Sequence, residues 1–219
     1  MKIYENRAIL RSPFFVEKNM IKTFIFDLGN VIVRFDHSRI VQRIEQFCDF
    51  KGDEIYSHFF LSTIVHEYDH GQISSVEFYD KIKQILSLKM SFSEFSDAWN
   101  CTFDLEPILP EELIKGLSEK YRLLILSDTN EFHFEFIREN FRALSYFDDY
   151  VLSYQVGAIK PAPEIFRAAI EKANCLPEEC FFTDDREPNV HGANSVGINA
   201  IQFTTTEKFI EDLQRLNLL

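Results

Sequence analysis

The sequence contains few cysteines, and their spacing argues against the common cysteine-based sites. Four cysteines occur in 219 residues, at Cys48, Cys101, Cys175 and Cys180. They form no paired Cys-x-x-Cys clusters and have no accompanying histidine spacing, a pattern that argues against a zinc site. We therefore expect reduced thiols and a cytoplasmic protein.

Two further features are missing: an uninterrupted apolar run near the start and a run of basic residues. Charged side chains are scattered through residues 1–20, so we expect neither a signal peptide nor a membrane span there. The formal net charge is −12, and no segment is rich in lysine or arginine. This balance argues against a nucleic acid or an anionic membrane as the main partner, although a metal and a few cations can still bind an anion locally.

Repeats, low-complexity tracts and linkers are also lacking, so the domain organisation has to be inferred from periodicity. The hydrophobic content of 46%, with 23 phenylalanines, supports a substantial core. An apolar strand is predicted over 21–27, and helical spacing follows it. Ser74 with Glu77 and Ser91 with Glu94 are capping-box pairs, which are typical of helix starts. Residues 37–105 are therefore predicted to be all-helical.

The second half of the chain alternates between helices and short apolar strands. Strands are predicted at 123–126, 150–152, 181–183 and 199–201, with a closing helix over 206–219. Such alternation indicates a parallel sheet with crossover helices. We expect an α/β protein with a doubly wound core of residues 21–36 and 106–219, interrupted by a helical cap over 37–105. Residues 1–20 are either a real N-terminal extension or an over-long start, and the sequence leaves the oligomeric state open.

Polar side chains follow four of the predicted strands. They are Asp27 after the first strand, Ser127 and Asp128 after the second, Lys160 after the third, and Asp184 with Asp185 after the fourth. The carboxyl ends of parallel strands meet at one edge of a sheet, so these groups should converge there. A carboxylate, a hydroxyl, an ammonium and a carboxylate pair are suited to phosphoryl transfer, as nucleophile, phosphate ligand, charge neutraliser and Mg²⁺ site.

These four motifs, in this order and strand context, resemble those of the haloacid dehalogenase superfamily of hydrolases, in the subgroup whose helical cap lies between the first two motifs. They frame residues 21–202. The cap segment 68–74 and the first motif, Asp-Leu-Gly-Asn-Val from Asp27, are similar to the branch that includes sugar-1-phosphate phosphatases. The resemblance implies a Rossmann-like three-layer core and a Mg²⁺-dependent phosphatase. Its partner would be a small-molecule phosphate ester, with a sugar phosphate first among the candidates.

The resemblance also implies a role for each strand-end residue. Asp27 would attack phosphorus and form an aspartyl-phosphate, which water then hydrolyses. The implied catalytic residues are Asp27, Ser127 and Lys160, the implied metal ligands are Asp27, Asp184, Asp185 and the Gly29 carbonyl, and the implied substrate-binding positions are Leu28, Gly29, Asp128 and Asn130. Two of these roles have an alternative. Instead of binding the metal directly, Asp185 would position a metal-bound water and Lys160. Instead of binding substrate, Asn130 would serve the geometry of its turn.

The chain departs from the family pattern at Gly29. Most phosphatases of the superfamily carry an Asp at this position, which protonates the leaving alkoxide and later activates water. Metal binding survives because the position contributes its backbone carbonyl, but general acid catalysis, typically worth about 10² to 10⁴ in rate, lacks its usual donor. Three outcomes are open: a cap residue such as His66 or His70 supplies the proton, the substrate has a good leaving group, or the enzyme is slow.

Asp128 is a second departure, because an Asn is more familiar after the Ser. Its carboxylate is either a surrogate acid or base, or it points away from the site. The departures keep a catalytically weak binding or regulatory protein open as a rival. A dehalogenase or phosphonate hydrolase using the same Asp27 is another rival, but halide displacement needs no metal, whereas Asp184 and Asp185 form an acidic pair typical of a metal site.

Overall fold

The computed structural model describes residues 20–219, so the predicted extension over 1–20 lies outside the described residues except for Met20. The strands are β1 (Thr23–Phe26), β2 (Val33–Phe35), β3 (Phe103–Pro107), β4 (Arg122–Ser127), β5 (Asp149–Leu152), β6 (Cys180–Asp184) and β7 (Asn199–Gln202). The α-helices are α1 (Ser38–Ile44), α2 (Gly52–Phe60), α3 (Ile64–Asp69), α4 (Ser75–Leu86), α5 (Phe92–Asn100), α6 (Glu111–Ser118), α7 (Glu131–Asn140), α8 (Ser153–Val156), α9 (Pro163–Ala173), α10 (Glu187–Ser195) and α11 (Thr206–Arg215). No helix of this described part is long and apolar enough to cross a bilayer.

The main sheet has five parallel strands in the order β5-β4-β1-β6-β7. Strand β1 is central, and Phe26 lies in register between Ile125 of β4 and Thr183 of β6. The five predicted strands are all present, and the predicted α/β fold class is confirmed. This register brings the carboxyl ends of β1, β4 and β6 to the same edge, which is where open α/β sheets bind ligands.

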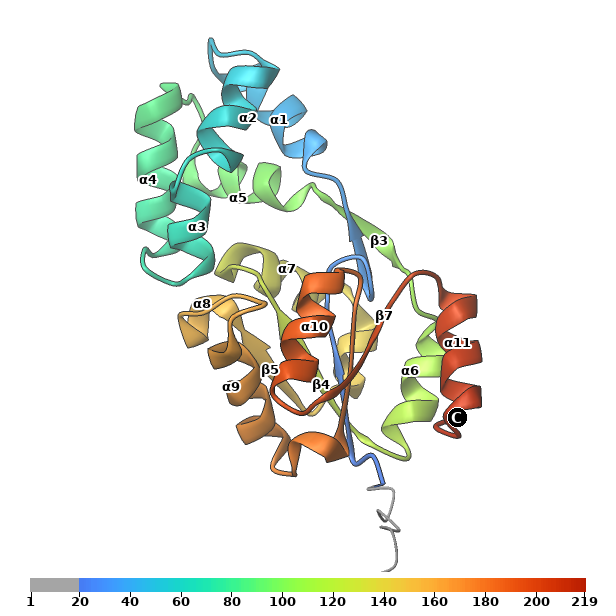
Figure 1. The fold of residues 1–219 in the computed structure, drawn as a ribbon. Helices are drawn as coiled ribbons and strands as arrows, with labels where there is room; N and C mark the ends of the chain where they lie inside the picture. The colour runs from blue at the N-terminus through green and yellow to red at the C-terminus, as the bar shows by residue number, and fades with distance from the viewer. Residues whose placement is uncertain (1–19) are drawn as a thin grey trace, which may run out of the picture.

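Helices cover both faces of the main sheet, which makes a three-layer core (Figure 1). Side chains alternate along β1, so Phe24 and Phe26 pack against α6, α7 and α11, whereas Ile25 packs against α9 and α10. The side chains of these three residues are fully buried. Strand β1 is therefore buried at every position and apolar from Phe24 onward, as expected for a strand covered on both faces.

The cap is a bundle of helices α1 to α5 with its own hydrophobic core around Trp99, and it lies over the carboxyl edge of the sheet (Figure 1). Both predicted capping boxes form at the starts of α4 and α5. Phe132 of α7 belongs to the cap's core and not to the main one. The cap is therefore packed directly on the first turns of α7.

The helical segment is shorter than the predicted 37–105. Helix α5 ends at Asn100, and Phe103–Pro107 forms strand β3, which pairs antiparallel with β2. These strands of three and five residues are too short to produce a clear period-2 pattern. Together they form the two-stranded connection between core and cap.

Candidate active site

The predicted nucleophile lies where β1 ends. The backbone N–H of Asp27 donates to the Thr183 carbonyl at 2.9 Å, which extends the sheet by one residue. The chain then turns, and the N–H of Leu28 donates to Asp27 Oδ1 at 2.7 Å. The Asp27 side chain is only 10% exposed. The turn thus fixes this carboxylate at the sheet edge with one oxygen held by the backbone.

Lys160 is buried between the carboxylates of two neighbouring strand ends. Its Nζ lies 2.7 Å from Asp27 Oδ1 and 2.7 Å from Asp184 Oδ2, and it donates to the Leu126 carbonyl at 3.1 Å. Burial lowers the pKa of Lys160, but attraction to Asp27, Asp184 and Asp128 outweighs it and raises the pKa above its usual value. The ammonium is therefore charged and fixed by three oxygens.

Three carboxylates form a group suited to a divalent cation. One oxygen each from Asp27, Asp184 and Asp185 lie within 4.8 Å of one another. Carboxylate oxygens are the ligands that Mg²⁺ prefers, and one ammonium against three carboxylates leaves a charge that a divalent cation would balance. Asn189 donates from Nδ2 to both oxygens of Asp184 at 3.0 Å, and Asn30 donates to Asp185 Oδ2 at 3.3 Å. The donor set fits Mg²⁺, with the amides orienting the ligands.

The pKa of Asp27 reflects the charges of the groups around it. Burial raises the pKa of Asp27 to about 7, opposed by the Lys160 ammonium and assisted by repulsion from Asp184. A cation bound beside these carboxylates would lower that pKa again, because it favours the charged form. In its charged form the Asp27 carboxylate would thus have two positive partners, Lys160 and a bound cation.

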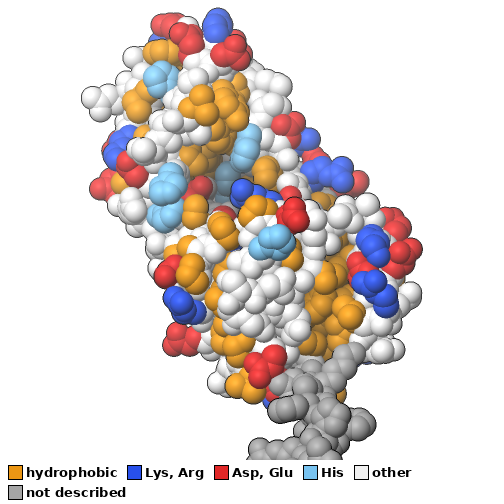
Figure 2. Space-filling model, in the orientation of Figure 1, with side chains coloured by type: hydrophobic (Ala, Val, Ile, Leu, Met, Phe, Trp, Pro, Cys, Tyr) orange, Lys and Arg blue, Asp and Glu red, His pale blue; other side chains and the backbone are white. Residues whose placement is uncertain are grey.

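A cavity of about 220 Å³ opens beside this group, between the core and the cap. Figure 2 shows hydrophobic and histidine side chains gathered where the two parts meet. Five of the predicted site residues line the cavity: Leu28, Gly29, Ser127, Asp128 and Asn130. The structure thus brings the predicted phosphate-binding turns to one cavity, whose outer wall is made by the cap.

Asn130 connects the core to the cap. It is the N-cap of α7, and its Oδ1 accepts hydrogen bonds from the His133 N–H at 3.2 Å and from Trp99 Nε1 at 3.3 Å. Its Nδ2 donates to Asp69 Oδ1 at 2.9 Å and lies 3.4 Å from His133 Nδ1. Both predicted alternatives for Asn130 are compatible with this, since it caps a turn and also lines the cavity.

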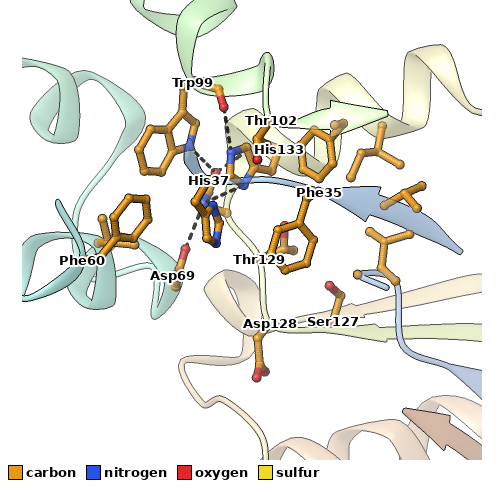
Figure 3. Close-up of a pocket in the computed structure, with 17 residues that line it drawn as sticks. Phe35, His37, Phe60, Asp69, Trp99, Thr102, Ser127, Asp128, Thr129 and His133 are labelled. Atoms are coloured by element: carbon orange, nitrogen blue, oxygen red, sulfur yellow. Dashed lines mark hydrogen bonds between the residues drawn. The ribbon is translucent and has the colours of Figure 1, made fainter. Parts of the chain in front are cut away.

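Asp128 lines the cavity, but its carboxylate accepts a hydrogen bond from the loop that carries Lys160. Oδ1 accepts a hydrogen bond from the backbone N–H of Lys160 at 2.9 Å. In Figure 3 the carboxylate points away from the labelled side chains that surround the cavity. Burial raises its pKa, and the nearby ammonium opposes the rise. Of the two predicted alternatives, the geometry favours the one in which Asp128 points away.

The space beside Gly29 is filled. A Cβ atom built on Gly29 would lie 2.7 Å from Cε1 of Phe35, closer than side chains normally approach. Phe35 is the last residue of β2 and lines the same cavity. An Asp side chain at position 29 would therefore have to displace this ring.

The two cap histidines named in the sequence analysis lie elsewhere. His66 and His70 stack on each other with ring centroids 3.9 Å apart, and neither lines the cavity. Asp69, which directly precedes His70, does line it. Sequence reasoning also missed Phe35, His37 and Thr102 in the cavity wall. Two signals for Asp69 were available in the sequence: the cap segment 68–74 that carries part of the family resemblance, and Gly71, which is typical of a turn.

The chain is similar to known hydrolases over most of its length. The family model described as haloacid dehalogenase-like hydrolase matches residues 21–197. D-ribitol-5-phosphate phosphatase of Bacteroides thetaiotaomicron is 31% identical over 189 residues, which cover 84% of this chain and 92% of that protein.

Solved structures show the same architecture. A HAD family enzyme from Bacteroides thetaiotaomicron, in complex with magnesium and inorganic phosphate, superposes with a TM-score of 0.74 at 31% identity, over 84% of this chain and 95% of that one. A predicted HAD-like family hydrolase from Porphyromonas gingivalis superposes with a TM-score of 0.75 at 25% identity, over 90% and 98% of the two chains. The likeness includes both the core and the cap, because it extends over nine-tenths of the chain.

Proposed function

Because this chain belongs to the haloacid dehalogenase-like hydrolases, we propose that it is a Mg²⁺-dependent phosphatase acting on the phosphate ester of a small polyol or sugar. The observation that carries the proposal is the arrangement of Asp27, Lys160 and Asp184, in which one buried ammonium lies 2.7 Å from each carboxylate. Such a group holds an anionic nucleophile beside the place where a phosphoryl group and a cation would bind.

Each residue of the group has a task in phosphoryl transfer. Asp27 attacks phosphorus, so that a bond from its free carboxylate oxygen forms while the ester P–O bond breaks. Ser127 and Lys160 bind the phosphoryl oxygens, together with the backbone N–H groups of the turn after Asp27. Water then attacks the aspartyl-phosphate and releases phosphate. Asp27, Asp184, Asp185 and the Gly29 carbonyl would hold Mg²⁺, which when bound would supply the charge that offsets repulsion between carboxylate and phosphate.

The cavity wall supports a hydroxylated substrate. Thr102 Oγ1 and His37 Nδ1 are buried polar atoms without a hydrogen-bond partner within the described residues, and both residues line the cavity. Buried polar groups are normally paired, and these two enclosed atoms would bind the hydroxyl groups of a polyol after a small movement of the wall uncovers them. The D-ribitol-5-phosphate phosphatase relative points to the same class of substrate.

A panel of phosphate esters tests the proposal. With Mg²⁺, we expect turnover of polyol and sugar phosphates, and loss of that turnover in Asp27→Asn. Asn has nearly the same shape as Asp, so a normal circular dichroism spectrum and unfolding midpoint would show that the fold is retained. Chloride release from a 2-haloacid without metal would instead identify a dehalogenase. Tight phosphate-analogue binding without turnover of any ester would identify a binding protein.

The substrate class has a separate test at Thr102. Thr102→Val removes the hydroxyl at nearly constant volume, so KM for a polyol phosphate should rise while kcat changes little. Turnover of p-nitrophenyl phosphate, which has no hydroxyl to bind, should be unchanged. An unchanged KM for every polyol and sugar phosphate in the panel would remove the hydroxyl argument and leave the phosphatase assignment in place.

A further inference from the structure

The site lacks a proton donor at the position where this family usually carries one. Residue 29 is Gly, and Phe35 occupies the space into which a side chain there would extend. An alkoxide is a poor leaving group unless it is protonated as the P–O bond breaks. If the substrate is a polyol or sugar phosphate, as proposed above, another acid has to reach the leaving oxygen.

Three titratable residues of the cavity wall are unsuited to this task. His133 is buried, and burial lowers its pKa to about 3. Its Nε2 donates to the Trp99 carbonyl at 3.2 Å, so the ring is neutral and its proton is committed. Burial also lowers the pKa of His37, which is therefore neutral near pH 7. Asp128 faces the Lys160 backbone and points away from the cavity.

Asp69 is the remaining acid in the wall, and it lies opposite the nucleophile turn. It lines the cavity together with Leu28 and Gly29, the two residues that follow Asp27. Figure 3 shows its carboxylate directed toward the cavity from the cap side, joined by a hydrogen bond to the loop after β4. That bond from Asn130 uses Oδ1, so Oδ2 is available to carry a proton.

The surroundings of Asp69 bring its pKa closer to neutral pH than that of an ordinary carboxyl group. Burial raises its pKa to about 6. Repulsion from Asp128 adds to the rise, whereas the hydrogen bond from Asn130 and the charge of His70 oppose it. A general acid is most effective when its pKa lies close to the working pH.

The turn that carries Asp69 is fixed to the core by its neighbours. The Tyr68 hydroxyl accepts a hydrogen bond from the Phe132 N–H at 3.1 Å, and the Ser75 hydroxyl donates to Glu131. Both partners lie in the first turn of α7. Gly71 has a φ of +65° and lies so close to the core that a Cβ there would be 1.9 Å from the Tyr154 carbonyl oxygen. Asp69 therefore has a defined place in the closed site.

We propose that Asp69, brought to the cavity by the cap, is the proton donor for the leaving group. As the ester P–O bond breaks, the proton on Asp69 Oδ2 passes to the leaving oxygen, and the alcohol departs neutral. The Asp69 carboxylate then accepts a proton from the water that attacks the aspartyl-phosphate, which restores the acid. Asn130 acts as a positioning residue by holding the other carboxylate oxygen.

The test compares two substrates in Asp69→Asn, which keeps the shape of the side chain and can still accept the bond from Asn130. On an alkyl phosphate such as ribitol 5-phosphate, we expect kcat to fall about 10² to 10⁴-fold, the usual contribution of a general acid. On p-nitrophenyl phosphate, whose leaving group needs no proton, kcat should change less than about threefold. Asp80→Asn, an exposed carboxylate of the same cap, is the matched control and should leave both rates unchanged.

The pH profile gives a second readout. Wild-type kcat on the alkyl phosphate should fall as the pH rises above about 6, and this fall should disappear in Asp69→Asn. Equal losses on the two substrates, with the pH profile unchanged, would show a structural role and overturn the proposal. The proposed function fails separately, because in that case neither substrate is turned over by the wild-type enzyme and Asp27→Asn changes nothing.

Discussion

Gly71→Ala tests whether direct contact with the core holds the Asp69 turn in place. A Cβ at this position would lie 1.9 Å from the carbonyl oxygen of Tyr154 and 2.9 Å from its carbonyl carbon. Both atoms belong to the backbone of α8, which cannot rotate away as a side chain can. Since Cβ atoms do not approach other atoms closer than 3.0 Å, the turn has to retreat from α8 by about 1 Å.

Two effects of different kind follow from this change. The φ of +65° is a left-handed conformation, which costs an alanine about 1–2 kcal/mol of stability. The displacement of the turn also moves Asp69 away from the leaving oxygen, and a misplacement of about 1 Å can lower a rate about 10²-fold. We therefore expect kcat/KM for an alkyl phosphate to fall about 10²-fold, with a much smaller fall for p-nitrophenyl phosphate.

Gly157→Ala is the matched control, because it carries the backbone strain without the contact. Its φ is +77°, and a Cβ there would meet nothing within 4 Å. Urea unfolding should show a loss of about 1–2 kcal/mol in this variant too, while its kcat/KM stays near that of the wild type. If the two variants have equal kcat/KM values on the alkyl phosphate, contact with Tyr154 does not position Asp69 and the reasoning is refuted.

Three other predictions concern charge and packing. Lys160→Met leaves the buried carboxylates without a positive partner, so the free energy of unfolding, measured with urea in the absence of metal, should fall by about 3–5 kcal/mol. Added Mg²⁺ should reduce this loss. A loss below about 1 kcal/mol would contradict the role of Lys160 as the charge that compensates these carboxylates. The pKa of His133 falls from 6.5 in the unfolded chain to about 3 in the folded protein. The resulting contribution to the free energy of unfolding, about 5 kcal/mol, is therefore complete above pH 6.5 and is lost as the pH falls toward 3. His133→Gln should make the free energy of unfolding less dependent on pH in that window. Gly29→Asp should lower the free energy of unfolding because its side chain meets the Phe35 ring, and this loss should be smaller in a protein that also carries Phe35→Ala. A double-mutant cycle should give a coupling free energy of about 0.5–3 kcal/mol. Additive effects would show that the ring moves freely.

The core of the site was predictable because its signals are local. Asp27 directly follows the apolar run of β1, and Asp184 is the last residue of β6. Parallel topology places such strand ends at one edge whatever the intervening sequence is. The same reasoning predicted all five strands of the main sheet, since each is a short apolar run between helical segments.

The cap's contribution was not predictable from spacing. The hydrogen bond between Asp69 and Asn130 joins residues 61 positions apart, and the one between Trp99 and Asn130 spans 31 positions. Neither pairing depends on a local period, because each requires the cap to be placed on α7. Phe35 was missed for a related reason: its ring fills the space at Gly29 only after β2 turns back along the first motif.

The position of the proton donor has a consequence for how the site would work. An acid at residue 29 would share a turn with Asp27 and be present whether the cap is open or closed. Asp69 belongs to the cap, so nucleophile and acid come together only when segment 68–75 contacts α7 and α8. Closure would then complete the site in one movement. An aspartyl-phosphate formed in the closed state would also lose its base when the cap opens, so hydrolysis has to precede opening.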